Sequence, residues 1–404
     1  METLDTNQLT LDSKNQNQDR IPRIISIDLL RGLVMVLMTL DHVRIFFSNT
    51  NFNPLDLTQS NIPLFLTRWV THICAPTFIF LAGISAYLSL KRGKTKQQLA
   101  RFLLIRGLWF IFLDLTIVRF SWRFDLSSIF SAAGVLWAIG WSMIFLAVII
   151  YLPTHTIAAI GILLIVGHNL FDSVQAAQLG NIGWIWTILH ERKMIEPISG
   201  FRLFILYPLI PWIGVMAVGY AFGTLFEIDK YRRLQLLRKI GLSMIVAFII
   251  IRAINVYGDP NPWSIQSNFF DTLLSFINCH KYPPSLLYLL ITLGLAILLL
   301  YCLEIQKKSL LKPLITLGQQ PLFFYIIHIF LIHITAIFFA LSTYGIEAFT
   351  FSYLGIIGKP EYVGYGLPKV YLIWLLMTCL LYIICNWFVE YKKKHRGHWW
   401  LNYF

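Results

Sequence analysis

The sequence predicts an all-α, polytopic integral membrane protein, a bundle of about ten transmembrane helices with both termini in the cytoplasm. Hydrophobic residues make up 57% of the 404 residues and charged residues only 13%, whereas a soluble domain has about 25% charged residues. Apolar runs long enough to cross about 30 Å of hydrocarbon recur along the chain. Lysine and arginine gather in alternate connecting segments, which is the bias that orients membrane helices.

Ten apolar runs are predicted to cross the membrane. They cover residues 24–47, 64–90, 100–119, 129–152, 155–171, 203–226, 239–257, 284–304, 313–341 and 368–389. Residues 1–22 are polar and rich in Asn and Gln, so we expect a disordered cytoplasmic leader and not a signal peptide. Residues 23–390 form the predicted transmembrane domain, and residues 391–404 form a basic cytoplasmic tail.

The first run carries more charge than a helix surrounded by lipid tolerates. Asp28 and Arg31 lie toward its cytoplasmic half, whereas Asp41, His42 and Arg44 lie near its outer end. An ionisable group at the centre of a spanning helix costs about 2.5 to 3.5 kcal/mol on insertion scales, so such groups usually face a bundle interior or a wet cavity. Asp28 and Arg31 share one face, which fits a structural ion pair or a substrate contact.

The second run enters from the outer side, so Arg68 and His72, one helical turn apart, lie in the same outer half. Pro76 removes a backbone donor and clashes with the carbonyl of His72, four residues earlier. Irregular backbone at membrane depth requires protein or a water-filled cavity around it. We therefore expect a wet pocket bordered by the first, second, sixth and ninth runs.

The middle runs add charges at both ends of the bundle. The third run places Arg106 toward the cytoplasm and Asp114 near mid-depth. Only Leu152, Pro153 and Thr154 separate the fourth and fifth runs, and residues 172–202 fit a re-entrant or interfacial piece. The seventh run places Arg252 near its outer end.

Proline interrupts the sixth run at Pro208 and Pro211, and the ninth run at Pro321. In the ninth run, His328 and His333 are five residues apart, which is about 140° around a helix, so they cannot share one face. We favour His328 for the pocket. The tenth run is followed directly by the basic tail.

The outer charges predict acid–base chemistry, because a carboxylate beside an imidazole supplies a base near neutral pH. The predicted catalytic residues are Asp41, His42 and His72. For His72 the alternative is an interhelical hydrogen bond. The predicted substrate-binding residues are Arg44, Arg68, Arg252 and His328. The three arginines would bind an anionic or carbonyl oxygen, or extend to the outer interface.

Other chemistries have weaker sequence support. No His-x-x-x-His or Glu-x-x-His spacing indicates a metal site, so no metal is expected. No Gly-x-Ser-x-Gly elbow indicates a serine nucleophile. The five cysteines have no metal or redox spacing. The net charge of +13 does not gather on a domain that would hold a duplex, so no nucleic acid is expected; much of it belongs to the segments that orient the chain beside the anionic inner leaflet.

Several motifs together resemble a known family. They are Arg23-x-x-Ser26-x-Asp28-x-x-Arg31-Gly32, Asp41-His42, Thr71-His72-Ile-Cys-Ala-Pro76, Val256-Tyr-Gly-Asp-Pro260, Lys281-Tyr-Pro-Pro-Ser285 and Leu317-Gly-x-x-Pro321 with His328. In this order they resemble bacterial membrane proteins related to the heparan-α-glucosaminide N-acetyltransferase catalytic domain, over nearly the whole chain after residue 22. The first motif also resembles the broader transmembrane acyltransferase superfamily, which includes O-antigen acetylases.

The resemblance implies acyl transfer from a cytoplasmic acyl-CoA to an acceptor reached from the other side. In the eukaryotic enzymes an Asn on the first helix and a luminal His are associated with catalysis. Asp41 occupies the Asn position here, and the loop of residues 48–63 holds no histidine, so His42 or His72 would serve instead.

The expected cofactor is acyl-CoA, in particular acetyl-CoA. The residues expected to bind its phosphates are Arg106, Lys91 and Arg92. The expected acceptor is a hydroxyl or amine of a glycan or another envelope component. The expected location is the bacterial cytoplasmic membrane, with the lipid bilayer as partner and a homodimer as one arrangement.

A second class of function remains open at this point. A proton-coupled secondary transporter of a small polar or anionic solute also needs intramembrane His, Asp and Arg and proline-broken helices. No inverted repeat between the two halves of the sequence favours it. A non-catalytic membrane scaffold is the third alternative, and the costly charges argue against it.

Overall fold

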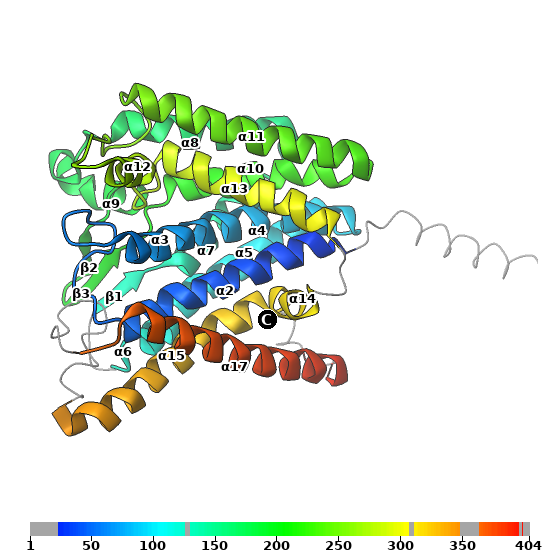
Figure 1. The fold of residues 1–404 in the computed structure, drawn as a ribbon. Coiled ribbons are helices and arrows are strands. Elements are labelled where there is room, and N and C mark those ends of the chain that lie inside the picture. Colours follow the sequence, from blue (N-terminus) through cyan, green and yellow to red (C-terminus); the bar gives the residue numbers. More distant parts are fainter. Residues whose placement is uncertain (1–22, 126–129, 307–310, 348–362, 396–397, 399–404) are drawn as a thin grey trace, which may run out of the picture.

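The computed structural model describes residues 23–125, 130–306, 311–347, 363–395 and 398. These residues form a helical bundle with a short three-stranded sheet at one end, and the C-terminal part of α17 (Leu367–Lys394) lies at the opposite end (Figure 1). The predicted leader, residues 1–22, lies outside the described residues, as does most of the tail beyond residue 395. We call the two ends of the bundle the sheet end and the C-terminal end.

Several of the helices coincide with predicted apolar runs. The helices are α2 (Ile25–Phe47), α3 (Ile62–Val70), α4 (Cys74–Lys91), α5 (Lys96–Leu113), α6 (Arg119–Arg123), α7 (Val135–Ile149), α8 (Thr154–Gly167), α9 (Gly183–His190), α10 (Ile210–Phe222), α11 (Lys230–Ile254), α12 (Phe269–Ile277), α13 (Leu286–Ile305), α14 (Lys312–Gly318), α15 (Pro321–Tyr344) and α17. The strands are β1 (Phe130–Ala133), β2 (Met194–Ile198) and β3 (Phe201–Ile205).

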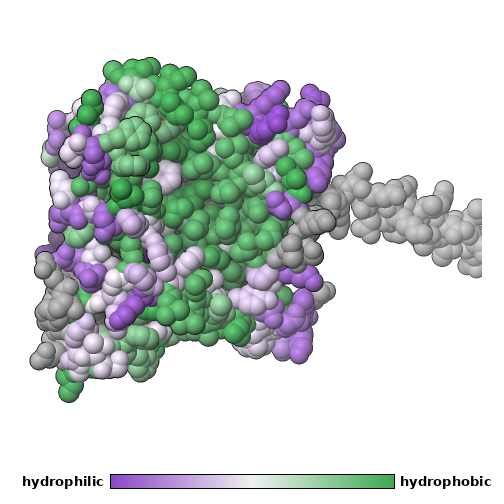
Figure 2. Space-filling view, viewed as in Figure 1, coloured by the Kyte–Doolittle hydropathy of each residue, from purple (hydrophilic) through white to green (hydrophobic). Residues whose placement is uncertain are grey.

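Among the described residues, six helical segments are long and apolar enough to cross a membrane: residues 62–91, which join α3 to α4, residues 154–171, which extend α8, and α11, α13, α15 and α17. Residues 135–149 and 210–226 form shorter apolar helices. In Figure 2 a hydrophobic belt crosses the molecule between two hydrophilic ends. A belt of this kind is what a bilayer requires of a helical protein. The chain is therefore a membrane protein, and the prediction of ten spans stays a prediction.

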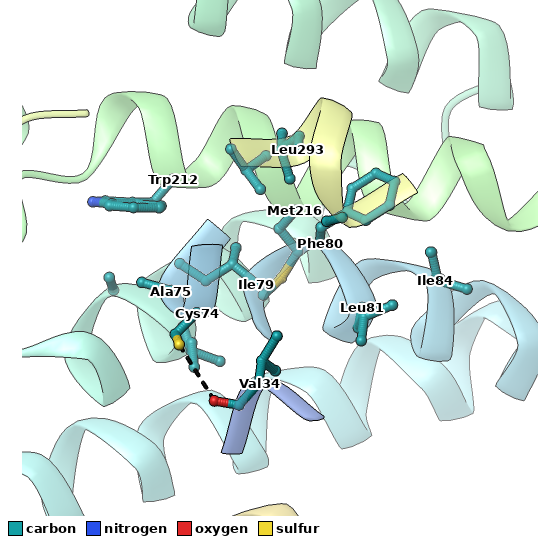
Figure 3. Packing of buried hydrophobic residues seen from close by; sticks show 14 of the residues in the cluster. Val34, Cys74, Ala75, Ile79, Phe80, Leu81, Ile84, Trp212, Met216 and Leu293 are labelled. Carbon is teal, nitrogen blue, oxygen red and sulfur yellow. Dashed lines mark hydrogen bonds between the residues drawn. The ribbon is translucent and has the colours of Figure 1, made fainter. Parts of the chain in front are cut away.

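Helix α2 lies in the middle of the packing and contacts α4, α13, α14, α15 and α17. In Figure 3, Val34 on α2 faces Cys74 at the start of α4, with Trp212 and Met216 of α10 and Leu293 of α13 around them. The Cys74 thiol donates a hydrogen bond to the Val34 carbonyl at 3.3 Å. Since each of these side chains is buried, this core holds α2 and α4 together below the outer charges.

Two pairs of glycines allow helices to touch backbone to backbone. A Cβ on Gly83 of α4 would overlap the carbonyl of Met216, and one on Gly219 would overlap that of Phe80, so α4 and α10 pack closely, as small residues at helix contacts allow. In the same way, a Cβ on Gly32 of α2 would overlap the Leu314 carbonyl of α14. None of these three glycines can be replaced by a larger residue without a shift of the helices.

Some predicted boundaries are wrong. The fourth run was expected to begin at residue 129, but residues 130–133 form β1, and α7 begins at Val135. The sixth run was expected from residue 203, but β3 extends to Ile205 and α10 begins at Ile210. Strand β3 pairs with β1 in parallel and with β2 in antiparallel orientation. Short apolar stretches do not distinguish a strand from a helix by periodicity, which explains both errors.

Two further segments differ from the prediction. The ninth run is two helices, because α14 ends at Gly318 and α15 restarts at Pro321, whose missing N–H is harmless in a first turn. Helix α12 follows the seventh run and was not predicted. Residues 172–202, for which we expected a re-entrant or interfacial piece, contain a 3₁₀ segment, α9 and β2 at the sheet end (Figure 1).

Candidate functional site

His42 and His328 form the centre of the candidate site. His42 is on α2 and His328 on α15, and the Nδ1 of His42 lies 2.7 Å from the Nε2 of His328. His328 is fully buried, whereas His42 is half-buried. Trp122 packs edge-on against the His42 ring at 5.1 Å between centroids. The structure thus brings together two of the histidines that the sequence selected.

The hydrogen bonds of this pair fix the positions of its protons when both rings are neutral. The Nδ1 of His328 lies 3.1 Å from the Phe324 carbonyl oxygen, which only accepts, so this nitrogen carries the proton. The Nε2 of His328 then accepts a hydrogen bond from the Nδ1–H of His42. A neutral imidazole has one donor and one acceptor, so the Nε2 of His42 keeps its lone pair. This tautomer is assigned from the network.

Asp41, the neighbour of His42 in the sequence, faces two arginines. Its carboxylate accepts from Arg44 at 3.1 Å and from Arg68 at 2.5 Å. All three side chains are largely buried. Each carboxylate oxygen has one guanidinium partner, so Asp41 orients two cations, whereas the imidazole of His42 is oriented by His328.

His72 lies where Pro76 predicted a broken helix. Residues Thr71–Ile73 form a 3₁₀ turn between α3 and α4. The Tyr288 hydroxyl of α13 donates to the His72 carbonyl at 2.7 Å, and the two rings are 5.3 Å apart. Within the described part of the chain, the buried Nε2 of His72 has no hydrogen-bond partner. His72 therefore belongs to a different set of contacts from the His42 and His328 pair.

Arg252, in the last turn of α11, is occupied by backbone carbonyls. Its guanidinium donates to the carbonyls of Phe276, Asn261, Ser275 and Asn278 at 2.9 to 3.2 Å. An Asp259 oxygen lies 3.8 Å from its Nη1. The side chain is almost completely buried. Arg252 thus holds the segment around α12 in place through backbone carbonyls.

Tyr282 is a site residue that sequence reasoning missed. It lies between α12 and α13, with the Lys281 ammonium 5.1 Å and the Arg192 guanidinium 5.1 Å from its ring centroid. Burial raises the pKa of the Tyr282 phenol, but the charges of Lys281 and Arg68 outweigh burial and hold this pKa below its ordinary value. A motif of Lys281 before Tyr282 was visible in the sequence, whereas the approach of Arg68 from another helix was not.

An open groove at the sheet end lies between three segments: residues 48–50 after α2, residues 61–64 at the start of α3, and residues 366–371 at the start of α17. Its polar lining includes Ser48, Asn49 and Asn61. The Tyr371 hydroxyl on its wall is 2.5 Å from the Thr67 hydroxyl, one residue before Arg68. This hydrogen bond joins the groove wall to α3, the helix that also carries Arg68.

The charges in the first turns of α2, at the C-terminal end of the bundle, are held by a shared network. Asp28 accepts from Arg23 at 2.6 Å and from Arg31 at 3.3 Å. Arg31 also donates to the Gly318 carbonyl at 3.1 Å and to the Ser85 hydroxyl at 3.0 Å. These contacts join α2, α4 and α14. They fit the structural interpretation of the Asp28 and Arg31 pair.

The residues expected to bind CoA lie around the same end. Lys91 pairs with Glu227 at 2.8 Å. Burial and the nearby Arg23 lower the pKa of Arg92, and burial and Arg106 lower the pKa of Lys94. The Arg106 guanidinium stacks over Phe102 and Phe110. Arg92 and Arg106 therefore each have a second cation close by, whereas Lys91 is neutralised by a carboxylate.

Asp114 has a role that the sequence did not reveal. Its carboxylate accepts from the backbone N–H of Gly134 at 2.6 Å and of Trp137 at 3.2 Å, so it caps the start of α7. It occupies a π-helical turn, Asp114–Val118, between α5 and α6. Because backbone donors satisfy its charge, this carboxylate at mid-depth is explained by structure.

Fold and site together define a membrane-embedded helical bundle in which two hydrogen-bonded imidazoles lie near buried arginines. Residues 23–257 match the family described as heparan-alpha-glucosaminide N-acetyltransferase, catalytic. The chain belongs to this family of membrane acyltransferases. The match ends at residue 257, so it covers α2 and α4 but not α15, and it is shorter than the resemblance in the sequence suggested. No curated protein shows significant similarity to the chain. The family match gives no support to the transporter alternative.

Proposed function

We propose that the chain transfers an acyl group, in the first place acetyl, from acyl-CoA to a hydroxyl or amine of an envelope glycan. The observation that carries this proposal is the hydrogen bond between His42 and His328, which leaves a lone pair on the Nε2 of His42. A half-buried imidazole with one nitrogen anchored and the other able to take a proton has the properties of a general base.

The reaction would proceed with His42 as the proton carrier. The acceptor O–H or N–H attacks the thioester carbonyl while its proton moves to the Nε2 of His42. The C–S bond then breaks, and the CoA sulfur takes the proton back from His42. During the step the imidazolium of His42 donates through Nδ1 to His328, a hydrogen bond that strengthens when the donor is charged. His328 is thus a positioning residue.

The two arginines on Asp41 are the proposed oxygen-binding groups. A guanidinium has five N–H donors, and Asp41 uses only part of those on Arg44 and Arg68. The remaining donors of Arg68 and the Nε–H of Arg44, which has no protein partner among the described residues, would bind the thioester carbonyl or the acceptor. Preorganised donors of this kind stabilise developing negative charge.

The donor would bind along α2. Asp28 and His42 are 14 residues apart on α2, which corresponds to roughly 21 Å along the axis at 1.5 Å per residue. The phosphates would lie at the C-terminal end with Arg92, Lys94 and Arg106, because clustered cations favour phosphate. The thioester would then reach His42 only if the rest of the donor is extended along the helix.

The acceptor would enter from the sheet end. The groove beside Ser48 and Asn61 has hydroxyl and amide groups that suit a carbohydrate, and its wall residue Tyr371 is hydrogen-bonded to Thr67, the neighbour of Arg68 in the sequence. Donor and acceptor would thus approach His42 from opposite ends of the bundle.

The proposed topology follows from the same assignment. We infer ten crossings of the bacterial cytoplasmic membrane, formed by α2, α3 with α4, α5, α7, α8, α10, α11, α13, α15 and α17, with both termini in the cytoplasm. The basic residues of segments 91–101, 230–239 and 392–394 would then be cytoplasmic, which agrees with the positive-inside rule.

Transfer of label from radioactive acetyl-CoA tests the proposed function. The full-length protein in vesicles is incubated with acetyl-CoA, labelled in the acetyl group, and with envelope glycans, and both labelled glycan and released CoA thiol are measured. We expect stoichiometric transfer and release by the wild type. His42→Gln should lower the rate by about two to four orders of magnitude, the usual contribution of a general base.

His333→Gln is the matched control, because His333 lies on the same helix as His328 but donates from Nδ1 to the Ser121 carbonyl at 2.9 Å. It should keep most of the activity. Undiminished labelling by His42→Gln at equal expression would show that the base is another residue. His72→Gln is measured in parallel, since His72 is the second candidate base.

A further inference from the structure

A second cluster of titratable side chains lies at the sheet end, away from the His42 and His328 pair. It consists of His168 in the 3₁₀ turn that follows α8, Asp172 just after that turn, and His190 at the end of α9. One ligand atom from each residue lies within 4.8 Å of the other two. Figure 1 shows α9 at the end of the molecule that bears the three strands.

His168 is the residue that requires an explanation. Its exposed fraction is 2%, and within the described ranges neither ring nitrogen has a hydrogen-bond partner. A buried polar group without a partner costs about 1 to 3 kcal/mol. The Pro284 carbonyl is the backbone oxygen that approaches the ring, as is common for the outer nitrogen of a metal-bound imidazole. A cation on the other nitrogen would remove most of this cost.

Neighbouring residues already hold the other two ligands. Asn169 donates to the Oδ2 of Asp172 at 2.9 Å, and its own carbonyl oxygen accepts from the Leu286 N–H at 2.9 Å. Trp186 stacks on His190 with 4.9 Å between ring centroids. The Oδ1 of Asp172 remains 3.6 Å from the Nε2 of His190. Support of this kind orients metal ligands in known sites.

We propose that His168, Asp172 and His190 bind one divalent transition-metal cation, with Zn²⁺ the best fit. Two imidazoles and one carboxylate are a ligand set that Zn²⁺ accepts, with water in the fourth position. The exposed side of Asp172 gives that water access. Ca²⁺ and Mg²⁺ prefer oxygen ligands throughout, so the two imidazoles disfavour them.

Binding requires a small local adjustment. Tetrahedral Zn²⁺ with bonds of about 2.0 to 2.2 Å holds its ligand atoms about 3.4 Å apart, so the three side chains must close slightly. The Nε2 of His190 now donates to the His168 carbonyl at 2.9 Å. If this nitrogen is the ligand, the ring must turn from that carbonyl and present a lone pair, its remaining proton moving to Nδ1. Only a neutral imidazole ligates a metal, so affinity falls at acid pH.

The cation would fasten the outer part of the bundle. It would join the end of α8 to the end of α9, and through Asn169 and the Leu286 N–H it would also fix the first turn of α13. The same turn carries Tyr288, which holds the His72 carbonyl. The role is structural, and it does not depend on the proposed acyl transfer.

Metal titration of the full-length protein tests the site. The protein is purified in detergent without a histidine tag, treated with EDTA and dialysed, then titrated with ZnCl₂ by calorimetry and with Co²⁺ by visible absorption. His395 and His398 lie close together, with 5.7 Å between ring centroids, so all samples carry His395→Gln and His398→Gln. We expect one Zn²⁺ per chain, ligand-field bands of four-coordinate Co²⁺, and a melting temperature that rises with Zn²⁺ concentration.

Asp172→Asn and His190→Gln should each weaken Zn²⁺ binding at least tenfold and abolish the thermal shift. His155→Gln is the matched control, because His155 is an exposed histidine on α8 itself, and it should bind like the parent. Asp172 is exposed, so its variant is expected to fold, and circular dichroism checks this. Equal Zn²⁺ affinity in the parent and Asp172→Asn, or no binding by the parent, would overturn the proposal.

Discussion

The Nδ1 of His42 lies 2.7 Å from the Nε2 of His328, although the two residues are 286 positions apart in the sequence. The rings are 5.0 Å apart between centroids and inclined by 23°. This hydrogen bond thus joins α2 directly to α15. His328 thus anchors the His42 ring through its Nδ1, and the Nε2 of His42 keeps the lone pair on which the proposed reaction depends.

His328→Gln should lower kcat for acetyl transfer at least tenfold and leave KM for acetyl-CoA nearly unchanged. The reason is that His328 orients His42 without touching the donor. Steady-state kinetics in vesicles measures both constants. His333→Gln is the control on the same helix. A change in KM alone would assign His328 to donor binding.

Asp41→Asn should destabilise the protein by on the order of 3 kcal/mol, because it leaves Arg44 and Arg68 as buried cations without their carboxylate. Thermal unfolding in detergent measures the change. Asp56→Asn is the control, since Asp56 is a partly exposed loop residue whose carboxylate accepts from Thr58 and Gln59 and faces no arginine in these contacts. Similar melting temperatures for both variants would contradict the assignment of Asp41.

Gly32→Ala should destabilise the protein by about 1 to 3 kcal/mol or more, because the added methyl group overlaps the Leu314 carbonyl of α14. Gly167→Ala at the end of α8 is the control. A Cβ there meets no atom within 4 Å among those the structure describes, and alanine favours the helix. The melting temperatures of the two variants are compared with that of the wild type. An unchanged melting temperature for Gly32→Ala would show that α2 and α14 are further apart than in this structure.

Tyr282 should ionise at lower pH than an ordinary tyrosine, because Lys281 and Arg68 overcome the effect of burial on its pKa. Its phenolate then contributes stability that is fully present above the ordinary tyrosine pKa of about 10. That contribution is lost as the pH falls through the lowered folded value. Ultraviolet titration of tyrosinate should show an early step that is absent in Tyr282→Phe.

Tyr257→Phe is the control for this titration. Burial and Asp172 raise the pKa of Tyr257, so its removal should leave the early step in place. An early step of unchanged size in Tyr282→Phe would mean that another tyrosine carries it.

The sequence predicted the position of α2 from a long apolar run with charges toward its ends. It favoured His328 over His333, and the structure places His328 against His42, whereas His333 contacts the Ser121 carbonyl. It also predicted the break at His72 from Pro76, since proline acts on a carbonyl at a fixed distance along the chain. These inferences need only local geometry.

The partners of the charged residues were not predictable in the same way. Arg252 suggested an oxygen-binding group, but it binds carbonyls of residues 9 to 26 positions away. No role was predicted for Asp114, and the structure shows that it caps α7, 20 to 23 positions away. His168 and His190 were not singled out, because a 22-residue separation matches no metal-ligand spacing. In each case a contact between elements decides the role.

The contact of Gly32 and Gly318 has a mechanical consequence. A Cβ on Gly318 would overlap the Asp28 carbonyl as closely as one on Gly32 would overlap the Leu314 carbonyl. The backbones of α2 and α14 are therefore in close contact at two points. They can neither slide past one another nor part without losing both contacts, and Arg31 crosses the same joint to the Gly318 carbonyl. If a nucleotide enters this end of the bundle, the opening must therefore form between other helices, and α2 and α14 must move together as one rigid unit.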